Sequence, residues 1–161
     1  MSQIKRKFSK VLAAIDGSQS SMDAAAYAAA MARKNNAQLI VLHILFSPLG
    51  YEYSSGKFGD ETIPSSVKQI FGAAKNEAEQ WFNKIKERID YKIEKNTIQI
   101  RTEVIVTDTS VAGAIIRYAE EHNVDLIVVG TRGRSAFTKL LLGSVASAVV
   151  TYAHCPVLLI K

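Results

Sequence analysis

The sequence has few of the features that mark secreted, membrane or zinc-binding proteins. Its 161 residues include one cysteine, Cys155, which excludes an intramolecular disulfide and a zinc site built from cysteines. No apolar run approaches the roughly 20 residues that cross a bilayer. The first apolar run, Val11–Ile15, ends at Asp16 and is too short for a signal peptide. We therefore expect a soluble, cytoplasmic protein that does not enter a membrane.

Positive charge is in excess only near the amino terminus. The net charge of +5 comes from 20 basic and 15 acidic residues, and Lys5, Arg6, Lys7 and Lys10 lie within the first ten positions. Without these four, 16 basic residues face 15 acidic ones. Proteins that bind nucleic acid usually spread lysine and arginine over a face or groove and interleave aromatic residues. Nucleic acid is therefore an unlikely partner, and the basic cluster is better interpreted as a solvated terminus.

Three widespread site motifs are also absent. A phosphate-binding G-x-x-x-x-G-K-[ST] loop is excluded because five residues separate Gly50 from Gly56, and Phe58 follows Lys57. The chain contains no G-x-G-x-x-G dinucleotide fingerprint. Residues 133–137 lack the second glycine of a nucleophile elbow.

The composition is that of a folded domain, with 48% hydrophobic and 22% charged residues. Residues 1–161 have the length of one domain. Most of the apolar runs are continuous and rich in valine, isoleucine and leucine, as in strands covered on both faces. The third partly alternates, which indicates a position nearer an edge of the sheet. The five runs are Val11–Ile15, Gln38–Leu45, Ile98–Val106, Asp125–Val129 and Val157–Ile160.

Helical patterns lie between these runs. Seven alanines fall between Ala24 and Ala32, and Asn35-Asn36 ends that segment. Apolar residues recur every three or four positions from Val67 to Ile89, and shorter stripes cover 112–119 and 145–152. The alternation predicts a Rossmann-like α/β fold, a single open five-stranded parallel sheet with helices on both faces. Ligands of such sheets bind at the carboxyl ends of the strands, where the strand order reverses.

One connection is out of pattern. The segment Phe46–Ser66 contains three glycines, two tyrosines and two prolines, and no apolar periodicity. Loops of that length are usually mobile, or act as lids and binding loops. Both interpretations stay open for this segment.

The most specific pattern is a pair of spaced glycine groups. Gly130-Thr131-Arg132-Gly133 follows the fourth strand directly, and nine residues later Gly143-Ser144-Val145 opens the last helix. Glycine permits a close backbone approach, and the free N–H groups of a helix start attract anions. The pattern favours phosphate binding, with the Ser144 hydroxyl as an additional donor. The alternative is that the glycines only turn the chain and Ser144 is a helix cap.

Charged and polar side chains beside these elements are further candidates. Asp16 follows the first strand, where a carboxylate contacts a ribose or a metal ion or caps the next helix. Arg132, Arg134 and Lys139 lie between the glycine groups and carry the charge that phosphate attracts.

Other residues have simpler interpretations. His43 lies in an apolar strand and Trp81 in a helical stripe, so both are expected in the core. Neither His122 nor His154 has a partner evident in the sequence. Cys155 beside Pro156 is expected to be small and buried, although a reactive thiol stays open.

Several of these segments together resemble the universal stress proteins of the ATP-binding type. They are Ile15-Asp16-Gly17-Ser18, Leu42-His43-Ile44, Val124-Asp125-Leu126-Ile127-Val128-Val129-Gly130, the spaced glycines with Gly143-Ser144-Val145, and His154-Cys155-Pro156-Val157-Leu158. The resemblance covers most of the chain, apart from Phe46–Ser66 and the long helix after it. It implies a five-stranded sheet of the adenine nucleotide alpha hydrolase-like type and a homodimer formed through the last strand.

The resemblance also implies roles for individual residues. Ala14, Ile15, Asp16 and Ile44 would surround adenine and ribose, and Val129, Gly130 and Thr131 would line the ribose side. Gly133, Gly143, Ser144, Val145 and Ala146 would hold the phosphates of ATP, ADP or AMP, with Mg²⁺ or Mn²⁺ between them. One departure is Thr109-Ser110-Val111, where relatives often have Gly-x-Pro.

The implied function is a nucleotide-dependent regulatory or stress-response protein. No general base, Walker lysine or nucleophile is evident, so an enzymatic role would be at most slow or partner-stimulated ATP hydrolysis. A dimeric interaction module with incidental nucleotide binding is the alternative. A phosphoacceptor switch is disfavoured because Asp16 lacks the acidic neighbour that such a site needs after its first strand.

Overall fold

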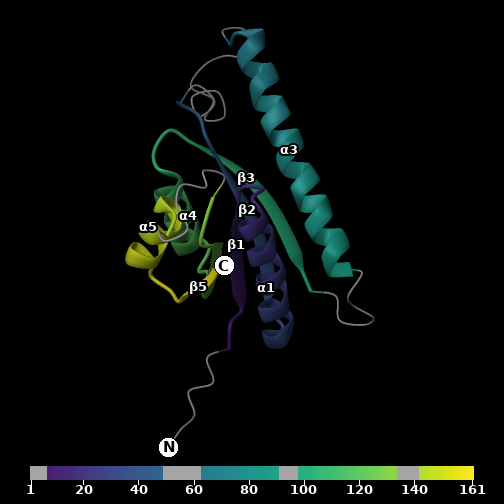
Figure 1. The fold of residues 1–161 in the computed structure, drawn as a ribbon, viewed down its shortest axis with the longest axis vertical. Helices are drawn as coiled ribbons and strands as arrows, with labels where there is room; N and C mark the ends of the chain where they lie inside the picture. Colours follow the sequence, from purple (N-terminus) through teal and green to yellow (C-terminus); the bar gives the residue numbers. More distant parts are fainter. Residues whose placement is uncertain (1–6, 49–62, 91–97, 134–141) are drawn as a thin grey trace, which may run out of the picture.

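Five parallel strands form the centre of the structure, a computed structural model that describes residues 7–48, 63–90, 98–133 and 142–161 (Figure 1). The strands lie side by side in the order β3-β2-β1-β4-β5. Their bounds are β1 Lys10–Ile15, β2 Gln38–Phe46, β3 Ile100–Thr107, β4 Leu126–Gly130 and β5 Val157–Ile160. The predicted α/β fold with its parallel sheet is therefore confirmed, and strand bounds differ from those expected by two residues at most. The third strand is an edge strand, as its alternating pattern predicted.

Helices cover both faces of the sheet. The helices in the described ranges are α1 Gln19–Asn35, α3 Ser65–Asp90, α4 Val111–Glu121 and α5 Ser144–Tyr152. On one face, α1 and α3 pack against Val11, Ala13 and Ile15 of β1. On the other, α4 and α5 pack against Leu12, Ile40 and Ile127. The central strands β1, β2 and β4 are buried on both sides, which explains their continuous apolar sequences.

Local signals set the ends of α1. Ser18 is the N-cap, and its side chain accepts a hydrogen bond from Ser21 N. Asn36 ends the helix in the left-handed conformation, with φ of 52°. The predicted stop at Asn35-Asn36 is correct, because asparagine tolerates this conformation better than most residues.

The long helix α3 is only partly packed. Phe71, Trp81, Phe82 and Ile85 are buried, whereas Ile70 belongs to the same apolar stripe and is 72% exposed. Figure 1 shows the amino-terminal half of α3 extending past the ends of the strands. Periodicity places a residue on a helix face but does not show how far the neighbouring sheet reaches. No helix among the described residues combines the length and apolarity that a bilayer crossing requires.

The topology fixes where a ligand site is expected. From β1 the chain moves to β2 and β3 on one side, and it then crosses to β4 and β5 on the other. The strand order therefore reverses between β1 and β4, whose carboxyl ends are followed by Asp16 and Thr131.

Candidate functional site

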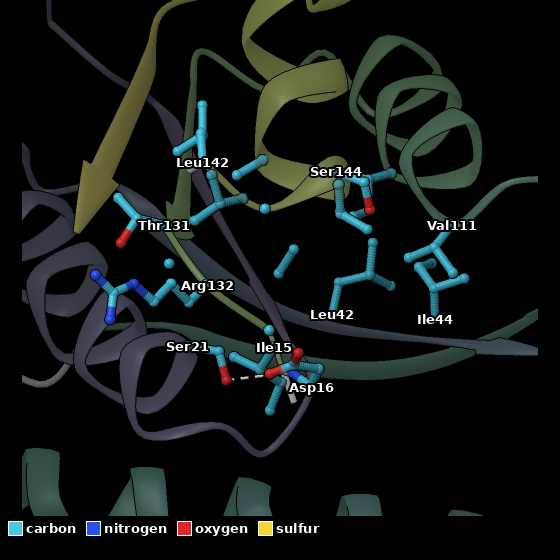
Figure 2. A pocket seen from close by; sticks show the side chains of 18 residues that line it. Ile15, Asp16, Ser21, Leu42, Ile44, Val111, Thr131, Arg132, Leu142 and Ser144 are labelled. Carbon is cyan, nitrogen blue, oxygen red and sulfur yellow. Dashed lines mark hydrogen bonds between the residues drawn. The ribbon is translucent and has the colours of Figure 1, made fainter. Parts of the chain in front are cut away.

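A cavity of about 540 Å³ opens at the carboxyl ends of β1 and β4 (Figure 2). All twelve residues proposed from the sequence line it. They are Ala14, Ile15, Asp16, Ile44, Val129, Gly130, Thr131, Gly133, Gly143, Ser144, Val145 and Ala146. Residues more than 100 positions apart in the sequence thus meet around one space, at the predicted reversal of strand order.

The turn between β1 and α1 holds Asp16 through short hydrogen bonds. Ser18 N donates to Asp16 Oδ1 over 3.0 Å. Asp16 N donates to Ser21 Oγ over 3.2 Å (Figure 2). Ser21 Oγ in turn donates to Ser18 O over 2.9 Å. The N-cap of α1 is Ser18 and not Asp16, so Asp16 supports the turn while its carboxylate also lines the cavity.

Gly17 makes this turn possible and places it against α3. Its φ is +81°, and an added Cβ would lie 2.3 Å from the ring of Trp81. Trp81 also meets the ring of His43 edge-on, with ring centroids 5.1 Å apart. His43 Nδ1 lies 2.8 Å from Ile15 O, and the side chain is half-buried. The predicted core role of Trp81 is correct, and both aromatic side chains support the backbone that carries Asp16.

The segment after β4 is tied to three other parts of the chain. At Gly130 the closest neighbours belong to α1, because an added Cβ would lie 2.4 Å from Ser20 Oγ and 2.9 Å from Ser21 N. Thr131 N donates to Ile160 O over 2.8 Å. Gly143 N donates to Thr131 O over 2.8 Å, which brings the two glycine groups together. Gly130 therefore allows a close approach of α1, a packing role that the sequence did not distinguish from ligand contact.

Gly133 faces the carboxylate of Asp16. A Cβ on Gly133 would lie 2.9 Å from Asp16 Oδ2, so only glycine leaves room for that oxygen in its present position. Residues from the ends of two different strands thus approach each other at the polar side of the cavity.

The start of α5 supplies main-chain donors. Its N-cap is Gly143, which offers no capping side chain, and the first helical residue is Ser144. The alternative that Ser144 caps the helix is therefore wrong. Ser147 N donates to Gly143 O, so the N–H groups of Ser144, Val145 and Ala146 have no partner within the helix. All three residues line the cavity, where their N–H groups and the helix dipole favour an anion.

One end of the cavity is apolar. Figure 2 shows Leu42, Ile44 and Val111 together at one end and Thr131 and Arg132 at the other. Six lining residues were not among the twelve proposed: Arg132, which the sequence singled out separately, and Ser21, Leu42, Val111, Ile115 and Leu142. Leu42 belongs to the quoted Leu42-His43-Ile44 segment, and Ile115 to a helical stripe. The spacing of Val111 and Ile115 at i and i+4 beside a strand end was the signal that could have found them.

The start of α4 forms despite the unusual Thr109-Ser110-Val111 sequence. Ser110 is the N-cap, and its side chain accepts a hydrogen bond from Gly113 N. Thr107 Oγ1 accepts from Thr109 N over 3.2 Å and lies 3.0 Å from Thr109 Oγ1. These side-chain contacts hold the turn and place Val111 at the cavity.

Other candidates lie elsewhere or outside the described residues. His122 is the C-cap residue of α4, and His154 Nε2 lies 3.2 Å from Val124 O. Burial and the nearby Asp125 raise the pKa of the half-buried Cys155 thiol, which argues against a reactive thiolate. Arg134, Lys139 and most of the connection from Phe46 to Ser66 lie outside the described residues.

Among the residues that the structure describes, few charged groups line the cavity. Arg132 is exposed and lines its mouth, and Asp16 is the acidic residue that lines it. In the part of the chain that the structure describes, no three histidine, cysteine or acidic side chains come together as a metal cluster. A divalent ion at this site would therefore need ligand phosphates and water beside the Asp16 carboxylate.

Taken together, the fold and the cavity define a doubly wound α/β protein with a candidate ligand site at its topological switch point, lined by apolar side chains and by the main-chain donors of a helix start. The model of the universal stress protein family matches residues 7–161. The chain therefore belongs to the universal stress protein family.

Individual relatives agree with this assignment. A universal stress protein of Bacillus subtilis is 33% identical over 157 residues, which cover 96% of this chain and 99% of the relative. The structure of UspA from Lactobacillus plantarum has the same fold, with a TM-score of 0.77 at 20% identity over 96% of this chain and 99% of that one.

Some structures of the family were solved with nucleotides. A universal stress protein in complex with cAMP is 25% identical, with a TM-score of 0.69 over 96% of this chain and 98% of that one. A protein from Archaeoglobus fulgidus is in complex with dAMP, and one from Arabidopsis thaliana has AMP bound. The Archaeoglobus fulgidus structure has a TM-score of 0.62 at 22% identity, over 96% of this chain and 98% of that one. The Arabidopsis thaliana structure has a TM-score of 0.59 at 20% identity, over 95% of this chain and 91% of that one.

Proposed function

We propose that this protein binds ATP in the cavity between β1 and β4 and acts as a nucleotide-dependent regulatory protein. The observation that carries the proposal is that one cavity of about 540 Å³ is lined both by apolar side chains and by the start of a helix. A nucleotide combines the matching features, a flat apolar base and anionic phosphates. Binding of cAMP, dAMP and AMP by relatives supports an adenine nucleotide as the ligand.

The base would occupy the apolar end. Leu42 and Ile44 are buried residues of β2, and Val111 and Ile115 of α4 face them across the cavity. Aliphatic side chains above and below a purine bury its faces without requiring a hydrogen bond. Ala14 and Ile15 at the end of β1 also line the cavity and would lie beside the base.

The phosphates would bind at the start of α5. The N–H groups of Ser144, Val145 and Ala146 have no partner within the helix, and the Ser144 hydroxyl is not used as a cap. Charged acceptors at such a site form hydrogen bonds that are roughly twice as strong as neutral ones. Gly133 and Gly143 add no side-chain atoms of their own beside the helix start.

Among the described groups that line the cavity, the Asp16 carboxylate is the one suited to bind a divalent ion. The Asp16 carboxylate lines the cavity, and Mg²⁺ or Mn²⁺ bound by one carboxylate, phosphate oxygens and water is a common arrangement. The ion would neutralise phosphate charge and orient the chain of phosphates. No lining side chain is placed as a general base for water, so slow or partner-stimulated hydrolysis is the most activity that we propose.

The first test is to identify the nucleotide that the purified protein carries. Protein prepared without added nucleotide is denatured, and the released material is identified by chromatography and mass spectrometry. We expect stoichiometric adenine nucleotide or, if the site is empty, saturable calorimetric binding of ATP with Mg²⁺. Absence of bound nucleotide together with no binding at millimolar ATP would overturn the proposal and favour the dimeric interaction module.

Filling the apolar end tests the location of the site. Val111→Trp places an indole in the space assigned to the base, so affinity for ATP and AMP should fall by at least about tenfold, a change of about 1.4 kcal/mol. Ile116→Trp is the matched control, because Ile116 is also half-buried on α4 and does not line the cavity. Equal loss in both variants, or unchanged affinity in Val111→Trp, would place the base elsewhere.

We also propose that two copies pair through β5. This strand lies at the edge of the sheet, and an exposed apolar edge usually requires cover. Val150 and Tyr152 on the adjacent α5 are 46% and 71% exposed, which adds apolar surface beside that edge. Sedimentation equilibrium is the direct measurement, and a monomer at micromolar concentration would contradict the pairing.

A further inference from the structure

The long helix α3 contacts the turn of the nucleotide site through the side chain of Trp81. None of the described residues of α3 lines the cavity, yet Trp81 packs directly against the turn that carries Asp16. The three atoms nearest to a Cβ on Gly17 all belong to the indole of Trp81, within 2.9 Å. Trp81 is itself buried in the core. The turn therefore cannot move toward α3 unless the indole is displaced.

A histidine of β2 contacts the same turn one residue before Asp16. His43 Nδ1 lies 2.8 Å from Ile15 O, and because a carbonyl oxygen only accepts, Nδ1 donates this hydrogen bond. The His43 ring also meets the Trp81 ring edge-on, with centroids 5.1 Å apart. The two rings together support the backbone on both sides of Asp16, at Ile15 and at Gly17.

The contact with the indole lies within the hydrogen-bonded turn that orients the Asp16 carboxylate. Ser18 N donates to Asp16 Oδ1 over 3.0 Å, and Gly17 is the residue between the donor and the acceptor. The other oxygen, Oδ2, faces Gly133 across the cavity. A shift of Gly17 would move the Ser18 N–H relative to the carboxylate, and both oxygens of Asp16 would change direction with it.

The residues proposed to bury the base lie on the other face of the sheet. Side chains of successive strand residues point to opposite faces, so Leu42 and Ile44 point away from the face of His43. Leu42 and Ile44 belong to the core beneath α4 and α5, whereas Trp81 belongs to the core beneath α1 and α3. A change at Trp81 is therefore expected to affect Asp16 and to leave the base end unchanged.

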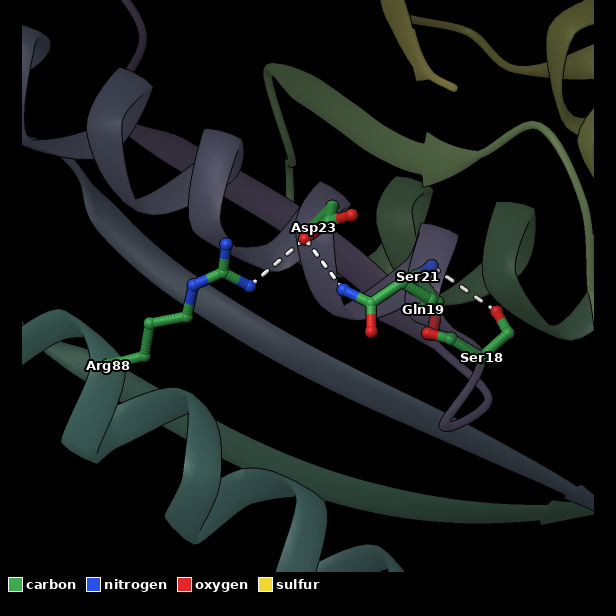
Figure 3. A network of polar contacts seen from close by, with 5 residues as sticks. All are labelled: Ser18, Gln19, Ser21, Asp23 and Arg88. Atoms are coloured by element: carbon green, nitrogen blue, oxygen red, sulfur yellow. Dashed lines mark hydrogen bonds and ion pairs between the residues drawn. The ribbon is translucent and has the colours of Figure 1, made fainter.

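An ion pair also joins α3 to the first turns of α1. Arg88 NH1 donates to Asp23 Oδ1 over 3.0 Å, and Gln19 Nε2 donates to the same oxygen over 3.1 Å (Figure 3). The side chains of Arg88 and Asp23 are 45% and 31% exposed, and pairs of this kind contribute little to stability. Neither residue lines the cavity. This pair therefore offers a control that joins the same two helices away from the cavity.

We propose that Trp81 is a positioning residue of the nucleotide site, and that its contact with Gly17 couples the packing of α3 to the metal-dependent part of nucleotide binding. The inference rests on the proposed function of the cavity. Coupling between two parts of a protein is reciprocal, so a nucleotide that binds with its metal ion at Asp16 also changes the environment of Trp81. The helix α3 thus responds to the nucleotide without contacting it.

The first test uses the fluorescence of Trp81. It is the only tryptophan among the 161 residues, so the intrinsic emission reports on this position without a label. Saturating ATP with Mg²⁺ should change the emission, whereas AMP with a chelator should change it little. Asp16→Asn should remove most of the metal-dependent change. Emission that stays constant while calorimetry shows ATP and Mg²⁺ to be bound would overturn the proposal.

The second test is the conservative variant Trp81→Phe, which removes the indole atoms nearest to Gly17 and keeps an aromatic ring beside His43. The gain in ATP affinity from Mg²⁺ should fall about fivefold or more, while affinity for AMP without metal changes little. Two controls on α3 should keep the parental gain. Arg88→Gln breaks the ion pair with α1, and Phe82→Leu truncates a fully buried side chain. A loss in Phe82→Leu as large as that in Trp81→Phe would show only general destabilisation and would overturn the positioning role.

Combining Trp81→Phe with Asp16→Asn tests whether Trp81 acts through Asp16. The double variant should lose no more of the Mg²⁺ gain than Asp16→Asn alone, and additive losses would overturn the proposal. The parent protein separates this inference from the proposed function. A parent that does not bind ATP overturns both. A parent that binds ATP without any gain from Mg²⁺, or whose full gain persists in Trp81→Phe, overturns this inference alone.

Discussion

At the scale of single residues, Asp16 combines a structural and a proposed chemical role. One carboxylate oxygen, Oδ1, accepts a hydrogen bond from Ser18 N, and the other, Oδ2, points toward Gly133. The first contact shapes the turn between β1 and α1. In our proposal the second oxygen contacts a metal ion or ribose. The two roles are separable because asparagine keeps an acceptor oxygen and removes the charge.

Asp16→Asn should therefore weaken metal-dependent binding without unfolding the turn. We expect the gain in ATP affinity from Mg²⁺ to fall roughly tenfold, while affinity for AMP without metal changes little. Calorimetric titrations with Mg²⁺ and with a chelator measure both quantities. Asp16→Ala is the comparison, since it also removes the acceptor for Ser18 N and should cost about 1 kcal/mol of stability. An unchanged Mg²⁺ effect in Asp16→Asn would exclude Asp16 as a metal ligand.

Cys155 gives a second prediction at this scale. Burial, and then the charge of Asp125, raise the pKa of its thiol, so the reactive thiolate is scarce at neutral pH. Alkylation by iodoacetamide, followed by mass spectrometry, should be much slower in the folded protein than in urea. Its rate should still be rising with pH above about 8.5, the ordinary thiol pKa. A rate that levels off below that pH would indicate an activated thiol instead.

Single residues also show which features of the site could be predicted from the sequence and which could not. The twelve residues that the family resemblance implied for the site all line one cavity, and the spaced glycines among them were also evident from the sequence pattern. The packing role of Gly130 was not predictable from the sequence. The side chain that a Cβ at this position would meet belongs to Ser20 of α1, more than 100 positions away. The amino-acid sequence alone does not distinguish a glycine that allows a helix to pack closely from a glycine that allows a ligand to bind closely.

At the scale of elements, contacts between helices and turns decide how the site is supported. The β1–α1 turn rests on α3 through Gly17 and Trp81, and α3 is the element whose periodicity was clearest in the sequence. Its exposed Ile70 and the exposed Tyr152 of α5 both belong to predicted apolar stripes. Strand and helix bounds follow local residue types, whereas the extent of packing depends on neighbours that the sequence alone does not reveal.

Two glycine-to-alanine variants test this support. Gly17→Ala combines a left-handed backbone with a Cβ 2.3 Å from the Trp81 ring, and should cost roughly 1–3 kcal/mol. Gly72→Ala is the matched control, because its Cβ meets nothing within 4 Å inside α3. That variant should gain about 0.5–1 kcal/mol from helix propensity. Urea unfolding measures both, and equal stability of Gly17→Ala and the parent would contradict the assigned role of this turn.

At the scale of the whole molecule, the sheet leaves a free edge at β5. Ile127 N donates to Pro156 O, and Thr131 N donates to Ile160 O, over 3.0 and 2.8 Å. Alternate residues of a strand direct their main-chain groups to opposite sides. Positions 156, 158 and 160 therefore face β4, and the main-chain groups of Val157 and Leu159 face away from the sheet. These outward groups are the ones that a second copy of the chain would pair with.

Proline substitutions on this strand separate dimer formation from folding. Leu159→Pro removes an outward N–H and leaves the pairing with β4 intact, so the variant should fold and sediment as a monomer. Leu158→Pro removes an N–H that faces β4 and should lower the free energy of unfolding by about 3 kcal/mol. Sedimentation equilibrium and thermal unfolding of both variants distinguish the two effects. If Leu159→Pro remains a dimer, the interface lies elsewhere, and the exposed Tyr152 surface of α5 becomes the next region to alter. All twelve proposed residues line one cavity of a single chain, so we expect each subunit to contain a complete nucleotide site. A Leu159→Pro monomer that binds ATP with the parental affinity would confirm this expectation.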